Sequence, residues 1–220
     1  MQQYYLNMDW HTVCGMIYKI LPSGVGYIYY PSFSYALGDD NIASLLAYFK
    51  DCPALIIDIR DNGGGDLSNV HTLVGHFIDH KIIGTYTRYK TGPGHHDFSA
   101  PYAVEYKPSP YGAWTKPVAV LTNRSCFSAA NDFVAVMKTL PQVTVIGART
   151  GGGGGMPFTY DLPAGWTVRM SVAPTFDAQM RSIESGIDPT PGCTITAPDS
   201  ELAAGRDPIL DFAIARLSNP

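Results

Sequence analysis

The sequence predicts an α/β fold with a mostly parallel core sheet. Short, nearly continuous apolar runs recur along the chain, and segments with helical spacing of apolar residues lie between them. A strand buried on both faces has such a continuous run, and strand–helix alternation is typical of α/β domains. The chain has 220 residues, of which 45% are hydrophobic. It is therefore long enough to bury the core of one domain.

The first half of the chain contains two of the expected strands and one helix. Residues 24–33, "GVGYIYYPSF", combine a glycine turn with aromatic and β-branched residues, which favours a strand. Residues 39–50 have apolar residues at helical spacing and an acidic first turn. Residues 54–60, "ALIIDIR", are expected to form a buried central strand. The following "DNGGGD", residues 61–66, is expected to be a loop.

The middle of the chain continues the alternation around one long loop. Residues 67–79 are expected to be a helix and residues 81–91 a strand. Residues 92–116 are rich in Gly, Pro and aromatic residues, which indicates a surface excursion of the kind that often carries function. Residues 117–123 are expected to be a second buried strand.

The remaining elements complete the α/β pattern. We expect a helix at 128–140, a third buried strand at 143–149 and an edge strand at 165–176. A final helix at 207–219 has Pro208 in its first turn, where proline is tolerated.

Composition argues against two classes of partner. The chain has 15 Lys and Arg against 19 Asp and Glu, a net charge of −4, and no basic block. A nucleic-acid partner is therefore not expected. No apolar run approaches about 18 residues, so no membrane span is expected. Because "MQQYYLNMDWHTV" resembles the middle of a protein, we expect residues 1–23 to be a linker or a remnant of an upstream domain, and 24–220 to be the main domain.

Ser128 is the first candidate for chemistry, because it stands where an expected strand gives way to an expected helix. The first four N–H groups of a helix have no internal partner and can hold an oxyanion; Ala129 would supply the nearest one. The alternative is that Ser128 only caps the helix, a common role for serine. Ser125 competes for both roles but lies further from the helix.

Three further segments are compatible with a site, although each has a simpler reading. The glycines of "DNGGGD" can present N–H groups to a ligand, or can form a flexible turn. The glycine run 151–155 lacks the context of a phosphate loop or a dinucleotide site. Glu184, in "SIESGIDPTP", could orient a base or could be a solvated turn residue. The six histidines provide no clear general base or metal motif.

Five segments in order resemble the C-terminal processing (tail-specific) serine peptidases, tricorn-core-like branch. They are "GVGYIYYPSF", "ALIIDIRDNGGGD", "KPVAVLTNRSCFSAANDF", "VIGARTGGGGGMPF" and "IESGIDPTP". The resemblance implies a crotonase-like spiral of βαβ units, with 24–220 as the catalytic domain. It also implies Ser128 as the nucleophile and Ala129 as one oxyanion donor. The second donor would lie within 63–65, at Gly64, and Glu184 would be the catalytic glutamate.

The general base departs from the family's pattern. In the lysine-dyad branch of the family the general base is a lysine. Its position corresponds to Gly153 in this sequence, so the lysine is absent here. In the other branch a histidine lies upstream of the first segment in an Asp-Gly-His-like context, and "DWHT" around His11 is a poor match. We therefore expect the base in sequence before Met1, together with a possible PDZ-like or helical domain.

The resemblance implies a serine endopeptidase that acts by acyl-enzyme chemistry on C-terminal or unfolded segments of exported proteins. It implies a location in the periplasm or cell envelope, a peptide partner, and neither cofactor nor metal. One alternative is a peptide-binding or scaffold module that keeps the fold without catalysis. Another is a crotonase relative that binds coenzyme A, which the Ser128 helix start and the Glu184 turn disfavour.

Overall fold

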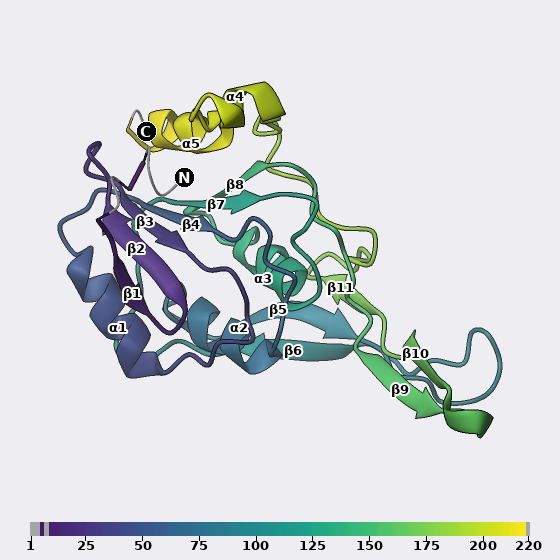
Figure 1. Cartoon of the computed structure of the whole chain (residues 1–220). Helices are drawn as coiled ribbons and strands as arrows, with labels where there is room; N and C mark the ends of the chain where they lie inside the picture. Colours follow the sequence, from purple (N-terminus) through teal and green to yellow (C-terminus); the bar gives the residue numbers. More distant parts are fainter. Residues whose placement is uncertain (1–4, 7–8, 219–220) are drawn as a thin grey trace.

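The computed structural model describes residues 5–6 and 9–218. Its central sheet has the strand order β1-β2-β3-β4-β7-β8 (Figure 1). These strands are listed in chain order: β1 (His11–Val13), β2 (Met16–Ile20), β3 (Gly26–Tyr29), β4 (Leu55–Asp58), β7 (Val118–Thr122) and β8 (Val143–Gly147). The last four are mutually parallel, whereas β1 and β2 pair antiparallel at one edge. The predicted α/β class with a mostly parallel core sheet is confirmed.

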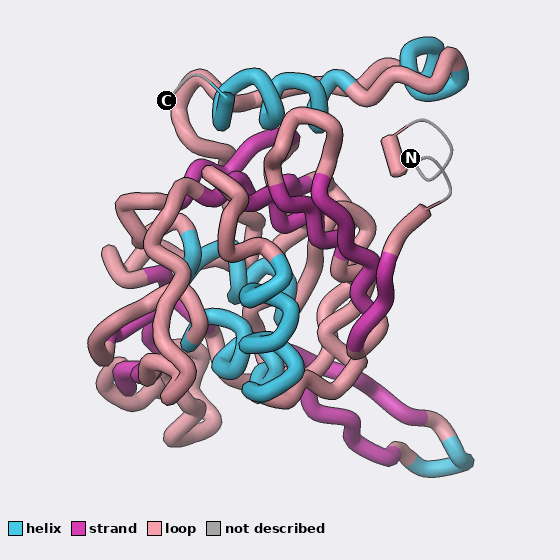
Figure 2. Tube along the Cα trace, turned by 90° about the vertical axis from the view of Figure 1, so that its left-hand side faces the viewer, coloured by secondary structure: helices cyan, strands magenta, loops and turns pink. Residues whose placement is uncertain are grey.

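Helices cover both faces of this sheet (Figures 1 and 2). One face packs against α1 (Asp39–Tyr48), α2 (Leu67–Gly75) and α3 (Ala129–Met137), and the other against α5 (Pro208–Ser218). Alternate strand residues supply the two cores, because successive side chains of a strand point to opposite faces. Ile57 and Val120 belong to the first core, whereas Ile56 and Leu121 belong to the second. Burial on both faces explains the continuous apolar runs.

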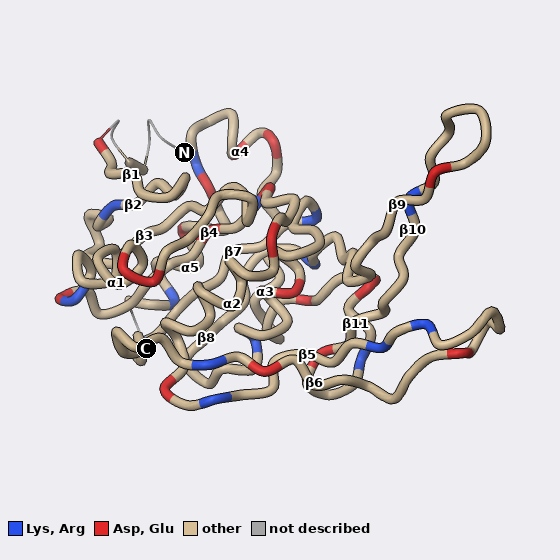
Figure 3. Tube along the Cα trace, turned by 90° about the horizontal axis from the view of Figure 1, so that it is seen from below, with Lys and Arg blue, Asp and Glu red and all other residues tan. Residues whose placement is uncertain are grey.

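A second, antiparallel sheet and a projecting hairpin complete the fold. The sheet has the order β11-β5-β6, formed by β11 (Thr175–Asp177), β5 (Ile82–Thr87) and β6 (Tyr102–Tyr106). The hairpin of β9 (Pro157–Asp161) and β10 (Thr167–Ser171), with a 3₁₀ turn η1 (Pro163–Gly165) at its tip, extends away from the body (Figures 1 and 3). A short helix, α4 (Asp199–Ala203), precedes α5.

The structure corrects two of the expected elements and adds a strand that was not expected. The loop expected at 92–116 contains β6, whose partner β5 holds it in a sheet. The single edge strand expected at 165–176 is two strands, β10 and the start of β11, in different sheets, and β9 was not predicted at all. Hairpin strands that are exposed on both sides lack the apolar runs that identify core strands.

The expected linker at 1–23 contains the edge strand β1 and its neighbour β2. Residues 11–20 form β1 and β2, and β2 pairs with β3 across the boundary expected at residue 23. The sheet therefore continues through that boundary, and the division into domains stays a prediction about the whole protein. Residues 1–4, 7–8 and the last position of the helix expected at 207–219 lie outside the described residues.

Candidate active site

Ser128 is held in a backbone conformation that serine rarely adopts. Strand β7 ends at Thr122, and six residues later Ser128 precedes the first turn of α3 with φ 56° and ψ −123°. Its side chain makes no capping hydrogen bond, although it occupies the N-cap position. A capping role is therefore not what this geometry supports. A positive φ in a residue with a side chain costs of order 1–3 kcal/mol, and such residues are concentrated at functional sites.

The backbone N–H of Ala129 lies next to this serine and is free. Ala130 N donates to the Phe127 carbonyl at 3.2 Å and Asp132 N to the Ser128 carbonyl at 3.0 Å. The N–H of Ala129 has no acceptor in the described part of the chain. A free N–H at a helix start, beside a serine hydroxyl that makes no capping hydrogen bond, can stabilise an oxyanion.

The triglycine bend packs directly on Ser128. A Cβ on Gly64 would lie 2.8 Å from the Cβ of Ser128 and 3.0 Å from the Ala129 nitrogen. Gly64 also has φ +101°, so no other residue fits here without strain. Its N–H, however, donates to Oδ1 of buried Asn62 at 2.9 Å. The bend thus lies where the sequence analysis expected it, while the expected Gly64 donor already has an acceptor.

Asn62 is a residue that the sequence analysis did not single out. Besides receiving the Gly64 N–H, it donates from Nδ2 to the Tyr30 carbonyl at 2.9 Å, and its carbonyl accepts from Phe127 N at 3.0 Å. It therefore joins β3, the triglycine bend and the turn before Ser128. The only signal in the sequence was an asparagine at the start of a glycine loop, which is common in turns.

Glu184 reaches the site through its backbone and the glycine run. Ser128 N donates to the Gly152 carbonyl at 2.9 Å, and Gly153 N donates to the Glu184 carbonyl at 3.1 Å. The run therefore lies between Ser128 and Glu184. A Cβ on Gly152 would overlap the Glu184 carbonyl oxygen, which explains the need for glycine there. The Glu184 side chain is exposed, and its carboxylate has no partner among the described residues.

The six histidines contact residues other than Ser128. His11 contacts the rings of Tyr18 and Tyr48, and His95 contacts His96. His71 stacks on Tyr106, while His76 and His80 pair with Asp39 and Asp79. Burial lowers the pKa of His71 and of His76, with Asp39 opposing the shift at His76. No described histidine hydrogen-bonds to Ser128 or Glu184.

The described residues show neither a metal-ligand cluster nor a helix that could span a membrane. There, no three His, Cys, Asp or Glu side chains gather as metal ligands would. None of the helices described combines the length and apolar character needed to cross a bilayer.

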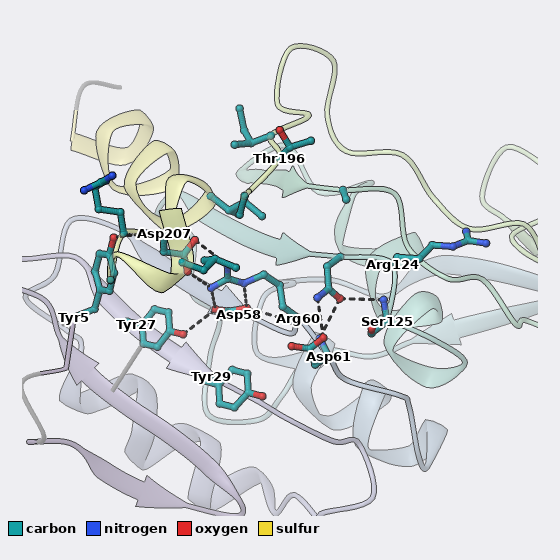
Figure 4. Close-up of a pocket in the computed structure, with 18 of the residues that line it drawn as sticks. Tyr5, Tyr27, Tyr29, Asp58, Arg60, Asp61, Arg124, Ser125, Thr196 and Asp207 are labelled. Carbon is teal, nitrogen blue, oxygen red and sulfur yellow. Dashed lines mark hydrogen bonds and ion pairs between the residues drawn. The ribbon is translucent and has the colours of Figure 1, made fainter. Parts of the chain in front are cut away.

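A cavity of about 860 Å³ lies on the opposite side of the sheet, beneath α5 (Figure 4). Its wall includes Tyr27, Tyr29 and the ion-paired Arg60, and Ser125 lies at one end. Ser128, Ala129, Gly64 and Glu184 do not line it. Ser125, the rival serine, therefore faces a different space from Ser128. This cavity is distinct from the Ser128 site.

Comparison with known proteins identifies the family. The model of peptidase family S41 matches residues 24–191. The chain belongs to peptidase family S41. This confirms the resemblance predicted from the five ordered segments and argues against a coenzyme A-binding relative. Members of the S41 family are serine hydrolases. A serine at a helix start that makes no capping hydrogen bond is compatible with that chemistry.

Three similar proteins are compared with the chain, the first two by sequence and the third by fold alone. The chain is 31% identical over 153 residues to the tail-specific protease of Haemophilus influenzae, covering 66% of this chain and 20% of that protein. A crystal structure of a peptidase candidate from Parabacteroides merdae is 45% identical with a TM-score of 0.92, covering 98% and 68%. Mature CPAF complexed with lactacystin, 17% identical with a TM-score of 0.75 over 88% and 51%, shares the fold.

Proposed function

We propose that this S41 chain is the catalytic domain of a serine endopeptidase with Ser128 as its nucleophile. Three features that lie side by side support this most. They are Ser128, which is strained and makes no capping hydrogen bond, the free N–H of Ala129, and the triglycine bend. Serine nucleophiles act beside donors that hold the developing oxyanion. The chain covers only a fifth of the tail-specific protease, so the activity of the whole protein is part of the proposal.

The reaction begins when a histidine base takes the hydroxyl proton and Ser128 Oγ attacks the scissile carbonyl. Ala129 N–H donates to the oxyanion. We place the second donor on Gly64, whose N–H exchanges Asn62 Oδ1 for the oxyanion, because Gly64 is the bend residue in contact with Ala129. The tetrahedral intermediate expels the amine to give an acyl-enzyme, and water then releases the acyl group. Glu184 orients the base.

We propose that the base itself lies in sequence before Met1. No described histidine bonds to Ser128, and glycine 153 occupies the family's lysine position. We expect an upstream PDZ-like or helical domain to accompany the base. The similarity to a tail-specific protease supports C-terminal or unfolded segments of exported proteins as substrates, and the periplasm or cell envelope as the compartment.

Labelling with a fluorophosphonate tests the proposal, because the reagent reacts with activated serines. The natural full-length protein should be labelled, and Ser128→Ala should abolish the label. Ser125→Ala is a matched control, since it removes an exposed serine three residues away, and it should leave labelling unchanged. The isolated 220-residue chain should be labelled at most weakly, because it lacks the base.

The second candidate is a peptide-binding module that keeps the fold without catalysis. The observation that favours it is the absence of a described base near Ser128. In that case the full-length protein would bind unfolded polypeptide but resist the fluorophosphonate. Strong labelling of the isolated chain would instead place the base within these 220 residues, with His11 and His95 as the first to re-examine.

A further inference from the structure

Two polar side chains, Asn131 and Thr150, are completely buried behind Ser128. Both have 0% of their surface exposed. Burying an amide or hydroxyl is unfavourable unless it is hydrogen-bonded. Thr150 Oγ1 and Asn131 Oδ1 lie 2.6 Å apart, although the two residues are separated by 19 positions in the chain. The pair therefore needs specific hydrogen-bond partners in the core, whereas an apolar pair that filled the same space would need none.

The partners determine the direction of every hydrogen bond in this pair. Ile187 N donates to Thr150 Oγ1 at 2.7 Å, so the hydroxyl proton is left to donate to Asn131 Oδ1. Asn131 Nδ2 then donates to the Ile183 carbonyl at 3.0 Å, and a carbonyl can only accept. Thr150 N also donates to the Ile187 carbonyl at 3.1 Å. The amide orientation of Asn131 is therefore unambiguous.

These bonds hold both ends of the turn that carries Glu184. Gly186 N donates to the Ile183 carbonyl at 3.0 Å, which closes the turn Ile183–Gly186. Asn131 anchors its first residue, and Thr150 anchors Ile187 directly after it. Asn131 lies three residues after Ser128, about one turn along α3. The nucleophile and Glu184 are thus tied to one rigid helix.

We propose that Asn131 and Thr150 are positioning residues that hold the Glu184 turn in register with Ser128. This inference rests on the proposed peptidase function. Neither side chain touches substrate, because both are buried; they act through the backbone on either side of Glu184. A carboxylate that orients a histidine base must be held in place, since a displacement near 1 Å can cost about 100-fold in rate.

Thr150→Val tests the proposal, because valine keeps the shape of threonine without its hydroxyl. The rate of fluorophosphonate labelling at Ser128 is measured on the natural full-length protein. We expect Thr150→Val to lower this rate by roughly 10- to 100-fold. Thr150→Ser restores a hydroxyl and should remain within about threefold of the wild type. Labelling by Thr150→Val at the wild-type rate would overturn the proposal.

Thr190 provides the matched control. Its Oγ1 accepts from Val145 N at 3.0 Å, and its own N donates to the Val145 carbonyl at 2.9 Å, which repeats the Thr150–Ile187 pattern. It has no bond to Asn131. Thr190→Val therefore removes the same kind of hydroxyl nearby and should label within about threefold of the wild type. If Thr190→Val slows labelling as much as Thr150→Val, the loss is general and the positioning role is wrong.

The pH profile of labelling separates positioning from simple loss of stability. A carboxylate beside a histidine favours the protonated form and raises the pKa of the base. Thr150→Val should therefore move the acid limb of the profile to lower pH, as Glu184→Gln should. Combining Thr150→Val with Glu184→Gln should slow labelling little beyond Glu184→Gln alone, because both changes act through one group. A fully additive loss with an unmoved acid limb would contradict the proposal.

Three further outcomes are informative. If Thr150→Val does not fold, Asn131→Asp takes its place; it keeps an acceptor for Thr150 but loses the donor to Ile183, and it should show the same shift. If the wild-type protein is not labelled at Ser128 at all, the peptidase function falls and the positioning role falls with it. Labelling of the wild type with no effect of either variant overturns the positioning role alone.

Discussion

Ser128 and its glycine neighbours show how a few residues create the backbone geometry of the proposed site. The serine has φ 56°, and the glycines at 64 and 152 have φ +101° and +90°. Gly64 lets the triglycine bend touch Ser128, and Gly152 lets the glycine run pass between Ser128 and Glu184. Side chains at either glycine would push these backbones apart. At the residue scale, the site depends on the absence of two Cβ atoms as much as on the hydroxyl.

Gly152→Ala is expected to disable the site. The new Cβ would overlap the Glu184 carbonyl oxygen and would also be strained at positive φ. Fluorophosphonate labelling of Ser128 in the full-length protein should fall at least about 100-fold, since backbone near the proposed nucleophile must move. Gly24→Ala is the control, because Gly24 has φ +82° but nothing within 4 Å of a new Cβ. Equal labelling of the two variants would show that overlap at Gly152 is unimportant.

At the scale of single elements, α3 is unusual because it carries a buried carboxyl. Asp132 lies one turn after Ser128 and is 7% exposed, and Tyr106 of β6 donates to its Oδ2 at 2.8 Å. Burial raises the pKa of Asp132 to about 6, although the hydrogen bond from Tyr106 opposes the rise. His71 of α2 stacks on Tyr106 at 4.1 Å between ring centroids. Helix α3 is thus joined to the second sheet by a buried hydrogen bond, and Tyr106 extends the link to α2 through its ring contact with His71.

The raised pKa of Asp132 gives stability a definite pH dependence. The folded state holds this proton more tightly than the unfolded chain, so its contribution is present in full below the unfolded pKa near 3.8. It is lost as the pH rises through about 6. Asp132→Asn should remove this slope and gain on the order of 2–3 kcal/mol relative to the wild type between pH 4 and pH 7. Urea unfolding at several pH values measures it; parallel curves for both proteins would refute the expectation.

At the scale of the whole molecule, an ion-pair cluster joins the sheet to the α5 layer (Figure 4). Arg60, just after β4, pairs with Asp58 at 2.6 Å and with Asp207 at 2.8 Å. Asp207 also accepts from Leu210 N in the first turn of α5. Burial disfavours the charged form of Arg60, but the two carboxylates outweigh burial and raise its pKa. The cluster therefore fixes the layer that closes the second core.

Arg60→Met should destabilise the fold strongly, because it leaves Asp58 and Asp207 buried without their cation. Removing one partner of a buried ion pair typically costs about 3–5 kcal/mol. The free energy of unfolding in urea at pH 7 measures the loss. Arg206→Met is the control, since Arg206 pairs with Glu201 at the surface and should have little effect. Unfolding of Arg60→Met at the wild-type urea concentration would contradict the expectation.

The sequence by itself determined the core strands, most helices and the neighbourhood of Ser128. These follow from local signals: continuous apolar runs for β4, β7 and β8, and glycines where side chains do not fit. The strands β1, β2, β6 and β9 escaped prediction because short or exposed strands have no such run. Their existence depends on pairing with partners elsewhere in the chain.

Only the tertiary structure decided how the site residues are connected. Asn62 takes the Gly64 N–H, and Asn131 reaches Ile183 across 52 positions of sequence. Such hydrogen bonds depend on which segments the folded core brings together. The sequence does not show whether an asparagine will be buried or exposed. Local composition can therefore name the serine and the glycines, whereas the direction of each donor is known only once the whole chain has packed.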